Sequence, residues 1–423
     1  SLTSVTCKLL EHIVVKSIMG YAEDNNIVCP QQHGFRRGHS CESQLLGFVD
    51  EASEAMERGH QEDVIVLDFS KAFDKVSHSL LVHKLRHYRI AEKTCRWIEN
   101  FLLDRTQTVV VGGAKSDPVP VQSGVPQGSV VGPSLFVLYI NDLPSGLTST
   151  VRLFADDTMC HNEIAVQADQ HQLQEDLTKL ASWEERWCMS FHPEKCTTMH
   201  MTRRRTTLQE TYTLHGHHLQ CVTEAKYLGV TISADLKWDT HVNNTVGRAN
   251  KTMGFLRRNL KTRNKRVKER AYKALVRPLL EYASPVWDPV NNNSVDSIEK
   301  VQRRAARWVS QDYRQSTRSE DLLTKLEWPL LQTRRTEARL NTFYKYHHGL
   351  LSINTQFPPT TNQQKRSRRQ TNSLAYDVPS HRTQYRQSTF FPRTIPQWNC
   401  LPEEVASAPT LSAFKGRLQK HFK

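Results

Sequence analysis

The chain has 423 residues, enough for several domains and a substantial hydrophobic core. Its 57 Lys and Arg against 43 Asp and Glu give a formal charge of +14, which favours a polyanionic partner such as nucleic acid without establishing one. No apolar run is long enough to span a bilayer and no secretory signal opens the chain, so we expect an intracellular protein rather than a membrane-spanning or secreted one.

The first part of the chain predicts a helix over residues 2–21. Its apolar residues follow helical spacing and are expected to pack in the core: Leu9, Leu10, Ile13, Val14 and Ile18. The chain begins with Ser1 and enters this pattern at once, which suggests a fragment of a longer open reading frame. Nine cysteines are scattered without a Cys-x-x-Cys pair, which argues against a zinc finger and predicts reduced, mostly buried thiols.

A basic loop follows at Gln31-Gln32-His33-Gly34-Phe35-Arg36-Arg37-Gly38. Its glycines would let the backbone approach a ligand closely, and the alternative is a solvated loop. A helix is expected over 43–58. The apolar run Val64-Ile65-Val66-Leu67 then predicts a buried strand that ends directly at Asp68.

Mainly helical structure is expected over 79–103, and a pair of hairpins over 107–123 around two adjacent glycines. The turn-rich segment Gln122-Ser123-Gly124-Val125-Pro126-Gln127-Gly128-Ser129 precedes a helix that should start near Pro133, because proline is tolerated in a first helical turn.

Two adjacent carboxylates, Asp156 and Asp157, stand between two short apolar runs that predict a β-hairpin. Taken alone, such a pair favours an ordinary polar turn, since Asp is common in turns. Asp68 adds a third carboxylate at the end of another strand. Three such groups could hold two Mg²⁺ ions, which take oxygen ligands and suit in-line phosphoryl transfer.

The rest of the chain is expected to be largely helical. Residues 166–188 predict an amphipathic helix with a core-facing stripe of Leu173, Leu177, Leu180, Trp183 and Trp187. From about 240 the pattern is helical and basic, and such clusters either form a solvated face or follow a phosphate backbone. Residues 354–388 are polar and expected to be largely flexible, with a basic run at 365–369 that could bind nucleic acid or act as a nuclear address. A short helix is expected after Pro409.

Three segments stand in a fixed order along the chain: Asp68-Phe69-Ser70-Lys71-Ala72-Phe73-Asp74, Gly124-Val125-Pro126-Gln127-Gly128-Ser129 and Phe154-Ala155-Asp156-Asp157. In this order they resemble the A, B and C motifs of reverse transcriptases, in the version of LINE-type (non-LTR) retrotransposons. Met189 to Cys196 resembles the D motif, and Tyr227-Leu228-Gly229 resembles the E motif or primer grip. The family usually has Arg-Pro-Ile before the opening Ser-Leu, and its absence fits a truncated fragment.

The resemblance implies an α+β fold in the form of a right hand, with fingers, an antiparallel palm sheet and a helical thumb. We expect partial fingers over 1–62, the palm with inserted fingers elements over 63–235, the thumb over 236–350 and a basic, partly flexible C-terminal region over 351–423. An endonuclease of the complete element would lie outside this fragment.

The resemblance also implies a role for individual residues. The catalytic metal ligands would be Asp68 and Asp156, with Asp157 completing the cluster. Lys195 would protonate the pyrophosphate leaving group, an exposed lysine being the alternative. Nucleotide contacts are expected from Phe69, Phe73, Gln127, Gly128 and Arg36. Template and primer contacts are expected from Gly124, Pro126, Tyr227, Leu228, Gly229, Lys261, Arg263, Lys265 and Arg266.

The activity that follows from the resemblance is addition of dNTPs to a primer 3′-hydroxyl on an RNA template. The expected partners are an RNA template, a DNA primer and dNTPs, the cofactors are two Mg²⁺ ions with Mn²⁺ as an alternative, and the place of action is the nucleus. A viral-type RNA-dependent RNA polymerase would carry Gly-Asp-Asp, and Ala155 together with Phe73 argues against it. An inactive remnant that still binds nucleic acid is the other alternative, against which the intact carboxylates and Gln127 argue.

Overall fold

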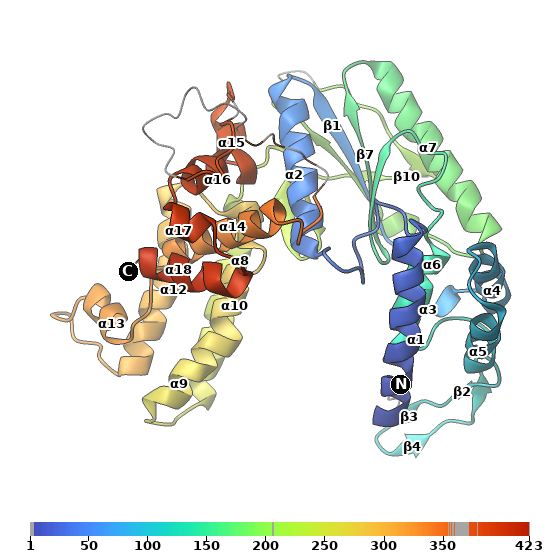
Figure 1. Ribbon diagram of the computed structural model, residues 1–423, viewed down its shortest axis with the longest axis horizontal. Helices are drawn as coiled ribbons and strands as arrows, with labels where there is room; N and C mark the ends of the chain where they lie inside the picture. The colour runs from blue at the N-terminus through green and yellow to red at the C-terminus, as the bar shows by residue number, and fades with distance from the viewer. Residues whose placement is uncertain are drawn as a thin grey trace. The chain divides into compact units, whose positions relative to one another are not determined.

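The computed structural model describes residues 4–204, 207–353, 355, 357, 359, 372–378 and 380–422, and it divides into two compact units (Figure 1). The first unit comprises Ser1–Ser40, His60–His200 and Arg204–Thr223, and the second comprises Cys41–Gly59, Met201–Arg203 and Glu224–Lys423. Helices and sheets together make an α+β architecture, as predicted. The basic run at 365–369 and much of the segment predicted to be flexible lie outside the described residues.

A five-stranded sheet in the order β11-β8-β1-β7-β6 forms the centre of the first unit. Its strands are β1 (Gln61–Leu67), β6 (Thr150–Phe154), β7 (Asp157–Ile164), β8 (Thr197–Met201) and β11 (Gln220–Cys221). The strand β7 pairs antiparallel with both β1 and β6, and Leu67 lies opposite Thr158. This register brings the end of β1 to the turn between β6 and β7, as the sequence pattern predicts.

Helices cover this sheet because each carries an apolar face. In α7 (Gln167–Arg186) the predicted stripe is confirmed, with Leu173, Leu177 and Leu180 fully buried. The short helix α6 (Val131–Tyr139) is buried at every residue except Pro133, and it contacts α1 (Val5–Asp24) and α4 (His78–His87). The remaining elements of the unit are α3 (Ala72–Lys75), α5 (Glu92–Leu102), η1 (Pro193–Lys195), β2 (Thr106–Gln107), β3 (Val110–Val111), β4 (Ala114–Lys115), β5 (Val119–Pro120), β9 (Thr213–Leu214) and β10 (His217–His218).

The predicted packing of the first helix is wrong. Leu9, Leu10 and Ile13 of α1 are 61%, 51% and 68% exposed, whereas Ile18 is buried. Helical spacing identifies a helix but not the face that packs. Here the buried face carries Glu11, whose carboxylate accepts hydrogen bonds from the backbone N–H groups of Val130 and Val131 and so caps the start of α6.

The thiols are free, as expected, but the prediction that most are buried is wrong. Only Cys95, Cys160 and Cys196 are buried, while four others are exposed: Cys7, Cys188, Cys221 and Cys400. Scattered positions along a chain do not reveal burial.

The second unit is mainly helical. It contains α2 (Cys41–Glu57), the hairpin of β12 (Glu224–Tyr227) and β13 (Val230–Ser233), α8 (Asp239–Asn259), α9 (Lys265–Ala271), the π-helical turn η2 (Tyr272–Val276), α10 (Arg277–Glu281), α11 (Ser284–Trp287), α12 (Asn292–Ser310), α13 (Ser319–Lys325), α14 (Leu331–His347), α15 (Gln384–Gln387), α16 (Phe390–Asn399), α17 (Glu403–Ala406) and α18 (Leu411–His421). The π-helical turn ends two residues before Pro278, which has no N–H to continue the α-helical pattern.

A buried ionic cluster joins three helices of this unit. The carboxylate of Asp288, just after α11, pairs with Arg335 and Arg339 of α14 at 2.7 and 3.0 Å and with Arg393 of α16 at 3.2 Å. A buried charge of this kind is tolerated because its partners replace the lost water. In the part of the chain that the structure describes, no helix is both long and apolar enough to cross a membrane.

Candidate active site

The structure brings the three predicted carboxylates to the same end of the sheet. Asp68 directly follows β1, Asp156 lies in the turn after β6, and Asp157 is the first residue of β7. Extending the β1–β7 register by one residue sets Asp68 opposite Asp157. The side chain of Asp68 is 49% exposed, so this group is open to a ligand.

The turn that carries Asp156 is held in an unusual conformation. It has only two residues, because Phe154 pairs directly with Asp157 across the hairpin. Ala155 has a φ of 54°, in the left-handed region that a residue with a Cβ adopts only at a cost. The direction in which Asp156 projects therefore depends on whatever keeps Ala155 in place.

The carboxylates influence one another electrostatically. Burial raises the pKa of Asp156, and the charge of Asp68 raises it further. Burial also raises the pKa of Asp157, with added contributions from Asp156 and Asp68. Like charges held this close favour either protonation or the arrival of a cation.

The carboxylates at this end of the sheet fit a hard cation that also takes ligands from outside the protein. Among the described residues, no group of three or more His, Cys, Asp or Glu side chains is arranged to hold a metal ion by itself. Mg²⁺ is commonly bound through one or two carboxylates, with water and substrate phosphates completing its shell. Asp68 and Asp156 offer carboxylates of this kind.

Lys195 lies beside Asp68, as the D-like motif implies. Its Nζ is 3.4 Å from Oδ2 of Asp68, and its side chain is 62% exposed. Two backbone hydrogen bonds align the D-like segment with the A-like segment, from Ser70 N to Ser190 O at 2.8 Å and from His192 N to Asp68 O at 2.7 Å. The ammonium group is thus placed by the fold at the acidic cluster.

The B-like loop is bound to the A-like segment. The N–H of Gly124 donates to Val76 O and that of Val125 to Phe73 O, both at 2.8 Å. Gly124 has a φ of 89°, and a Cβ there would lie 2.7 Å from Cα of Asp74. A polar cavity of about 630 Å³ lies along this contact, and its walls include Lys71, Asp74, Arg105 and Gln127.

Gln127 and Gly128 are exposed at this cavity or beside it, as nucleotide-contacting residues would have to be. Nε2 of Gln127 donates a hydrogen bond to Oδ1 of Asp74 at 3.2 Å. Asp74 is part of the A-like motif, but the motif alone predicts no function for it. The contact shows that it orients Gln127.

Three other residues predicted to contact the nucleotide are engaged in packing or ion pairs. Phe69 is 6% exposed and stacks on Phe191, with ring centroids 4.3 Å apart. Phe73 is half-buried and stacks on Phe136 at 4.3 Å. Arg36 donates to both carboxylate oxygens of Glu23, so its guanidinium is already occupied.

The E-like turn and the predicted basic residues belong to the second unit. Leu228 and Gly229 both have positive φ, and the hydroxyl of Tyr282 donates to Leu228 O at 2.9 Å, which fixes the turn. The basic residues are exposed around the start of α9: Lys261, Arg263, Lys265 and Arg266.

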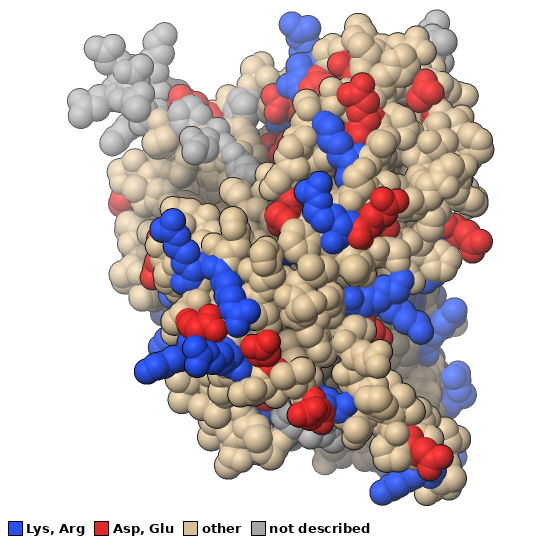
Figure 2. All heavy atoms as spheres, turned by 90° about the vertical axis from the view of Figure 1, so that its right-hand side faces the viewer, with Lys and Arg blue, Asp and Glu red and all other residues tan. Residues whose placement is uncertain are grey.

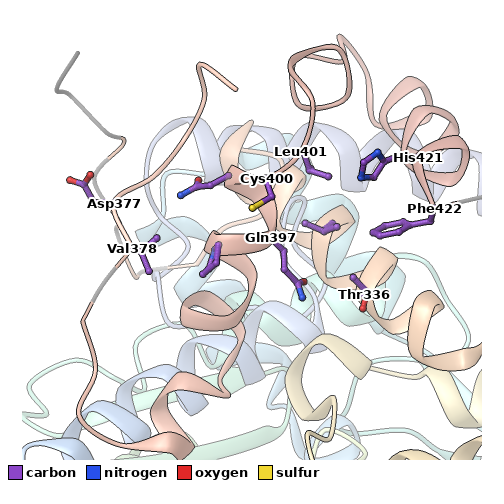
Figure 3. Close-up of a pocket in the computed structure, with 11 residues that line it drawn as sticks. Thr336, Asp377, Val378, Gln397, Cys400, Leu401, His421 and Phe422 are labelled. Carbon is purple, nitrogen blue, oxygen red and sulfur yellow. The ribbon is translucent and has the colours of Figure 1, made fainter. Parts of the chain in front are cut away.

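The side of the molecule on which α4, α5 and α7 lie carries Lys and Arg interspersed with Asp and Glu rather than a patch of one sign (Figure 2). A cavity of about 930 Å³ in the second unit has Thr336 of α14, Gln397 of α16 and His421 of α18 among its lining residues (Figure 3). Its lining includes none of the predicted site residues.

Comparison with known proteins places this geometry in a family. Residues 1–232 match the family described as reverse transcriptase (RNA-dependent DNA polymerase). The chain is 28% identical over 382 residues to the probable RNA-directed DNA polymerase from transposon BS of Drosophila melanogaster, which covers 83% of this chain and 40% of that protein. It is also 28% identical over 315 residues to the RNA-directed DNA polymerase from mobile element jockey of the same species, covering 72% of this chain and 34% of that protein.

The chain therefore spans about two fifths or less of the length of these curated relatives. Among solved structures, apo telomerase from Candida tropicalis aligns with a TM-score of 0.44 and 10% identity over 77% of this chain and 54% of that one, a score too low to establish a shared fold. The family match covers more than half of the chain and includes all three carboxylates. The chain belongs to the reverse transcriptase family.

Proposed function

We propose that the chain is the polymerase part of an RNA-directed DNA polymerase from a non-LTR retrotransposon. It adds dNTPs to a primer 3′-hydroxyl under the direction of an RNA template. The observation that carries this proposal is the meeting of Asp68 with Asp156 and Asp157 at one end of the sheet, within a chain of the reverse transcriptase family. The activity named for the transposon BS and jockey relatives supports it.

In this function Asp68 and Asp156 would hold two Mg²⁺ ions, and Asp157 would complete the acidic cluster. Bound there, the ions would supply charge neutralisation for the attacking and leaving oxygens of an in-line displacement. The carboxylates of this chain position the reacting groups, and their mutual repulsion favours cation binding. The ordering of donors on two adjacent strands keeps this arrangement fixed during the reaction.

Lys195 supplies a proton. As the primer 3′-hydroxyl releases its proton to water and its oxygen bonds to the α-phosphorus, the bond to pyrophosphate breaks and the leaving oxygen gains negative charge. An exposed ammonium 3.4 Å from Asp68 is within reach of a triphosphate bound there, and it donates its proton to the departing pyrophosphate. The ion pair with Asp68 holds the ammonium group of Lys195 at the acidic cluster before substrate arrives.

The B-like loop forms the nucleotide side of the site. Gln127, oriented by Asp74, and Gly128, with its positive φ, lie where backbone and amide groups can contact the templating base pair. Gly124 and Val125 hold the loop against the A-like segment and the residues just after it, and the carbonyl of Pro126 accepts a hydrogen bond from Ser129 within the loop. Phe73 presents a half-buried ring next to this loop, and we assign it to the sugar of the incoming nucleotide.

The first unit carries the palm and part of the fingers in this proposal, and the second carries the thumb. The exposed basic residues around the start of α9 suit a phosphate backbone, and the Leu228-Gly229 turn suits the primer strand. Copying RNA into chromosomal DNA would place the protein in the nucleus.

Primer extension on defined templates tests the proposal. The purified chain is given a DNA primer annealed to RNA or to DNA of the same sequence, with dNTPs and Mg²⁺. We expect extension on the RNA template that stops when EDTA is added or when Asp156 is replaced by Ala. Extension with rNTPs in preference to dNTPs would instead identify an RNA polymerase, and extension that survives EDTA would contradict the metal mechanism.

A further inference from the structure

Residues 31–33 continue the central sheet beyond its edge strand β6. The N–H of Leu153 donates to Gln31 O at 3.0 Å, and the N–H of His33 donates to Leu153 O at 2.8 Å. Gln32 and Leu153 form a parallel bridge. This basic loop is therefore bound to the strand that leads, two residues later, into the turn with Asp156.

The side chain of Gln32 reaches into that turn. It is fully buried, and its Oε1 accepts hydrogen bonds from Gly34 N at 2.7 Å and from Ala155 N at 2.9 Å. Since both partners are N–H donors, only the amide oxygen can face them, which settles the orientation of the amide.

The hydrogen bond to Gln32 is made by Ala155, the residue of the turn with a positive φ. Ala155 has a φ of 54°, which is unfavourable for a residue with a Cβ. Losing the hydrogen bond to Gln32 would also leave the backbone N–H of Ala155 without this acceptor. Gln32 therefore stabilises the conformation that sets the direction of Asp156.

Gly34 packs closely against the same turn. A Cβ at this position would lie 2.4 Å from N of Ala155 and 3.0 Å from C of Phe154. Its φ does not lie in the left-handed region, so glycine is required here by close approach alone. Any side chain at 34 would push on the turn.

Arg36 holds the backbone of Gln32 in place. Its Nε and Nη2 bind the carboxylate of Glu23 at the end of α1 at 2.7 and 2.5 Å. Its Nη1 donates to Cys29 O at 2.8 Å and to Gln32 O at 3.1 Å. A continuous set of contacts thus runs from α1 through Arg36 and Gln32 to Ala155.

We propose that Gln32 is a positioning residue for the catalytic turn, acting through Ala155 to hold the carboxylate of Asp156 in its metal-binding direction, with Gly34 as its steric counterpart. The proposal rests on the proposed function, because it assumes that Asp156 binds the metal ions. It assigns to this loop a role inside the protein, distinct from contact with template or nucleotide.

The test compares Gln32→Met, Gly34→Ala and the control Gly20→Ala, whose added Cβ meets no atom within 4 Å. The readouts are kcat, the KM for dNTP, the Mg²⁺ concentration for half-maximal extension, Mn²⁺ binding by calorimetry and the thermal midpoint. We expect kcat to fall about 10- to 100-fold in the first two variants. Metal affinity should fall severalfold, while KM changes little and Gly20→Ala matches the wild type.

Equal metal affinity and a kcat within twofold of wild type in Gln32→Met would overturn the proposal. So would a kcat per folded molecule of Gln32→Met equal to that of the wild type. As a rescue, Ala155→Gly in the Gln32→Met background should restore much of the lost kcat, because glycine adopts the positive φ without strain.

Two further results separate this proposal from its premise. If Gln32→Met does not fold, Gln32→Glu decides, since it keeps the acceptor but adds a charge at Ala155; we expect altered metal affinity, and wild-type metal affinity and kcat would contradict the proposal. If the wild type does not extend primers, the proposed function fails. Mn²⁺ binding that is lost in Asp156→Ala and weakened in Gln32→Met would still support the positioning role, and equal binding in Gln32→Met and wild type would refute it.

Discussion

Individual residues in this chain divide into those open to a ligand and those committed to the fold. Asp68 and Lys195 are half-exposed or more at the sheet end, whereas Phe69 and Arg36 are engaged by neighbouring groups. Phe73 lies between these cases, because one face of its ring stacks on Phe136 while the side chain stays half-buried. Residue-level predictions therefore depend on exposure as well as on motif.

Phe73→Val tests the assignment of this ring to the nucleotide sugar. If the ring occupies the space of a ribose 2′-hydroxyl, its truncation should raise the kcat/KM for an rNTP relative to the matched dNTP. If Phe73 only packs in the core, both rates should fall together as stability is lost. Single-nucleotide insertion measures the ratio, and Phe101→Val, a half-buried stacked ring on α5, is the matched control. An unchanged ratio in Phe73→Val would return Phe73 to the core.

The buried Lys84 should make the free energy of unfolding depend on pH. It is 3% exposed, pairs with Asp142 at 2.5 Å and lies 3.5 Å from the ring centre of Trp187. Burial lowers the pKa of Lys84 to about 8, against 10.5 for an ordinary lysine. Between these pH values the unfolded chain binds more protons than the folded chain. The free energy of unfolding should therefore rise with pH across this window, by as much as about 3 kcal/mol.

Urea unfolding at several pH values between 7.5 and 10 measures this slope. Lys84→Met should remove the rise, whereas the exposed Lys93→Met should keep it. If wild type and Lys84→Met show the same pH slope, Lys84 is not the group responsible.

At the scale of elements, the candidate site depends on loops held against strands. The hairpin of β6 and β7 delivers Asp156 and Asp157, and the D-like segment pairs with the residues after β1. The B-like loop pairs with the A-like segment through Gly124 and Val125. Close backbone approach at these contacts makes glycine necessary at particular positions.

Gly124→Ala should damage both stability and nucleotide use. Gly124 and Gly112 both have positive φ, but an added Cβ at Gly112 meets no atom within 4 Å, whereas one at Gly124 meets the backbone of Asp74 at 2.7 Å. Gly112→Ala should cost only about 1–2 kcal/mol of backbone strain. Gly124→Ala should cost more and raise the KM for dNTP, because it displaces Asp74 from Gln127. Equal unfolding free energies and KM values for the two variants would show that the contact is unimportant.

At the scale of the whole molecule, the sequence predicts features whose pattern is local and does not predict contacts between residues far apart in the chain. The strand before Asp68, the hairpin around Asp156 and the amphipathic α7 all have local patterns, and the structure confirms them. The exposed face of α1 could not be predicted, because spacing identifies a helix but not its partner. The bond between Gln32 and Ala155 joins residues 123 positions apart, and a single sequence contains no signal for it.

The same limit applies to Asp74 and Arg36. Both stand in motifs that the sequence identifies, but their partners, Gln127 and Glu23, are set by folding. Motif order therefore predicts the clustered carboxylates better than it predicts the contacts that orient the residues around them. The division into fingers, palm and thumb stays a prediction.

Single-nucleotide incorporation by carboxylate variants tests the central claim most directly. The assay uses a primed RNA template with Mg²⁺ and compares the wild type with Asp68→Ala, Asp156→Ala and Asp157→Ala. The control is Asp117→Ala, which changes an exposed residue between β4 and β5. We predict that the first three variants keep the wild-type circular dichroism spectrum and lose incorporation by about 10²–10³-fold or more, while Asp117→Ala stays active. Incorporation at a near wild-type rate by Asp68→Ala or Asp156→Ala would contradict the account.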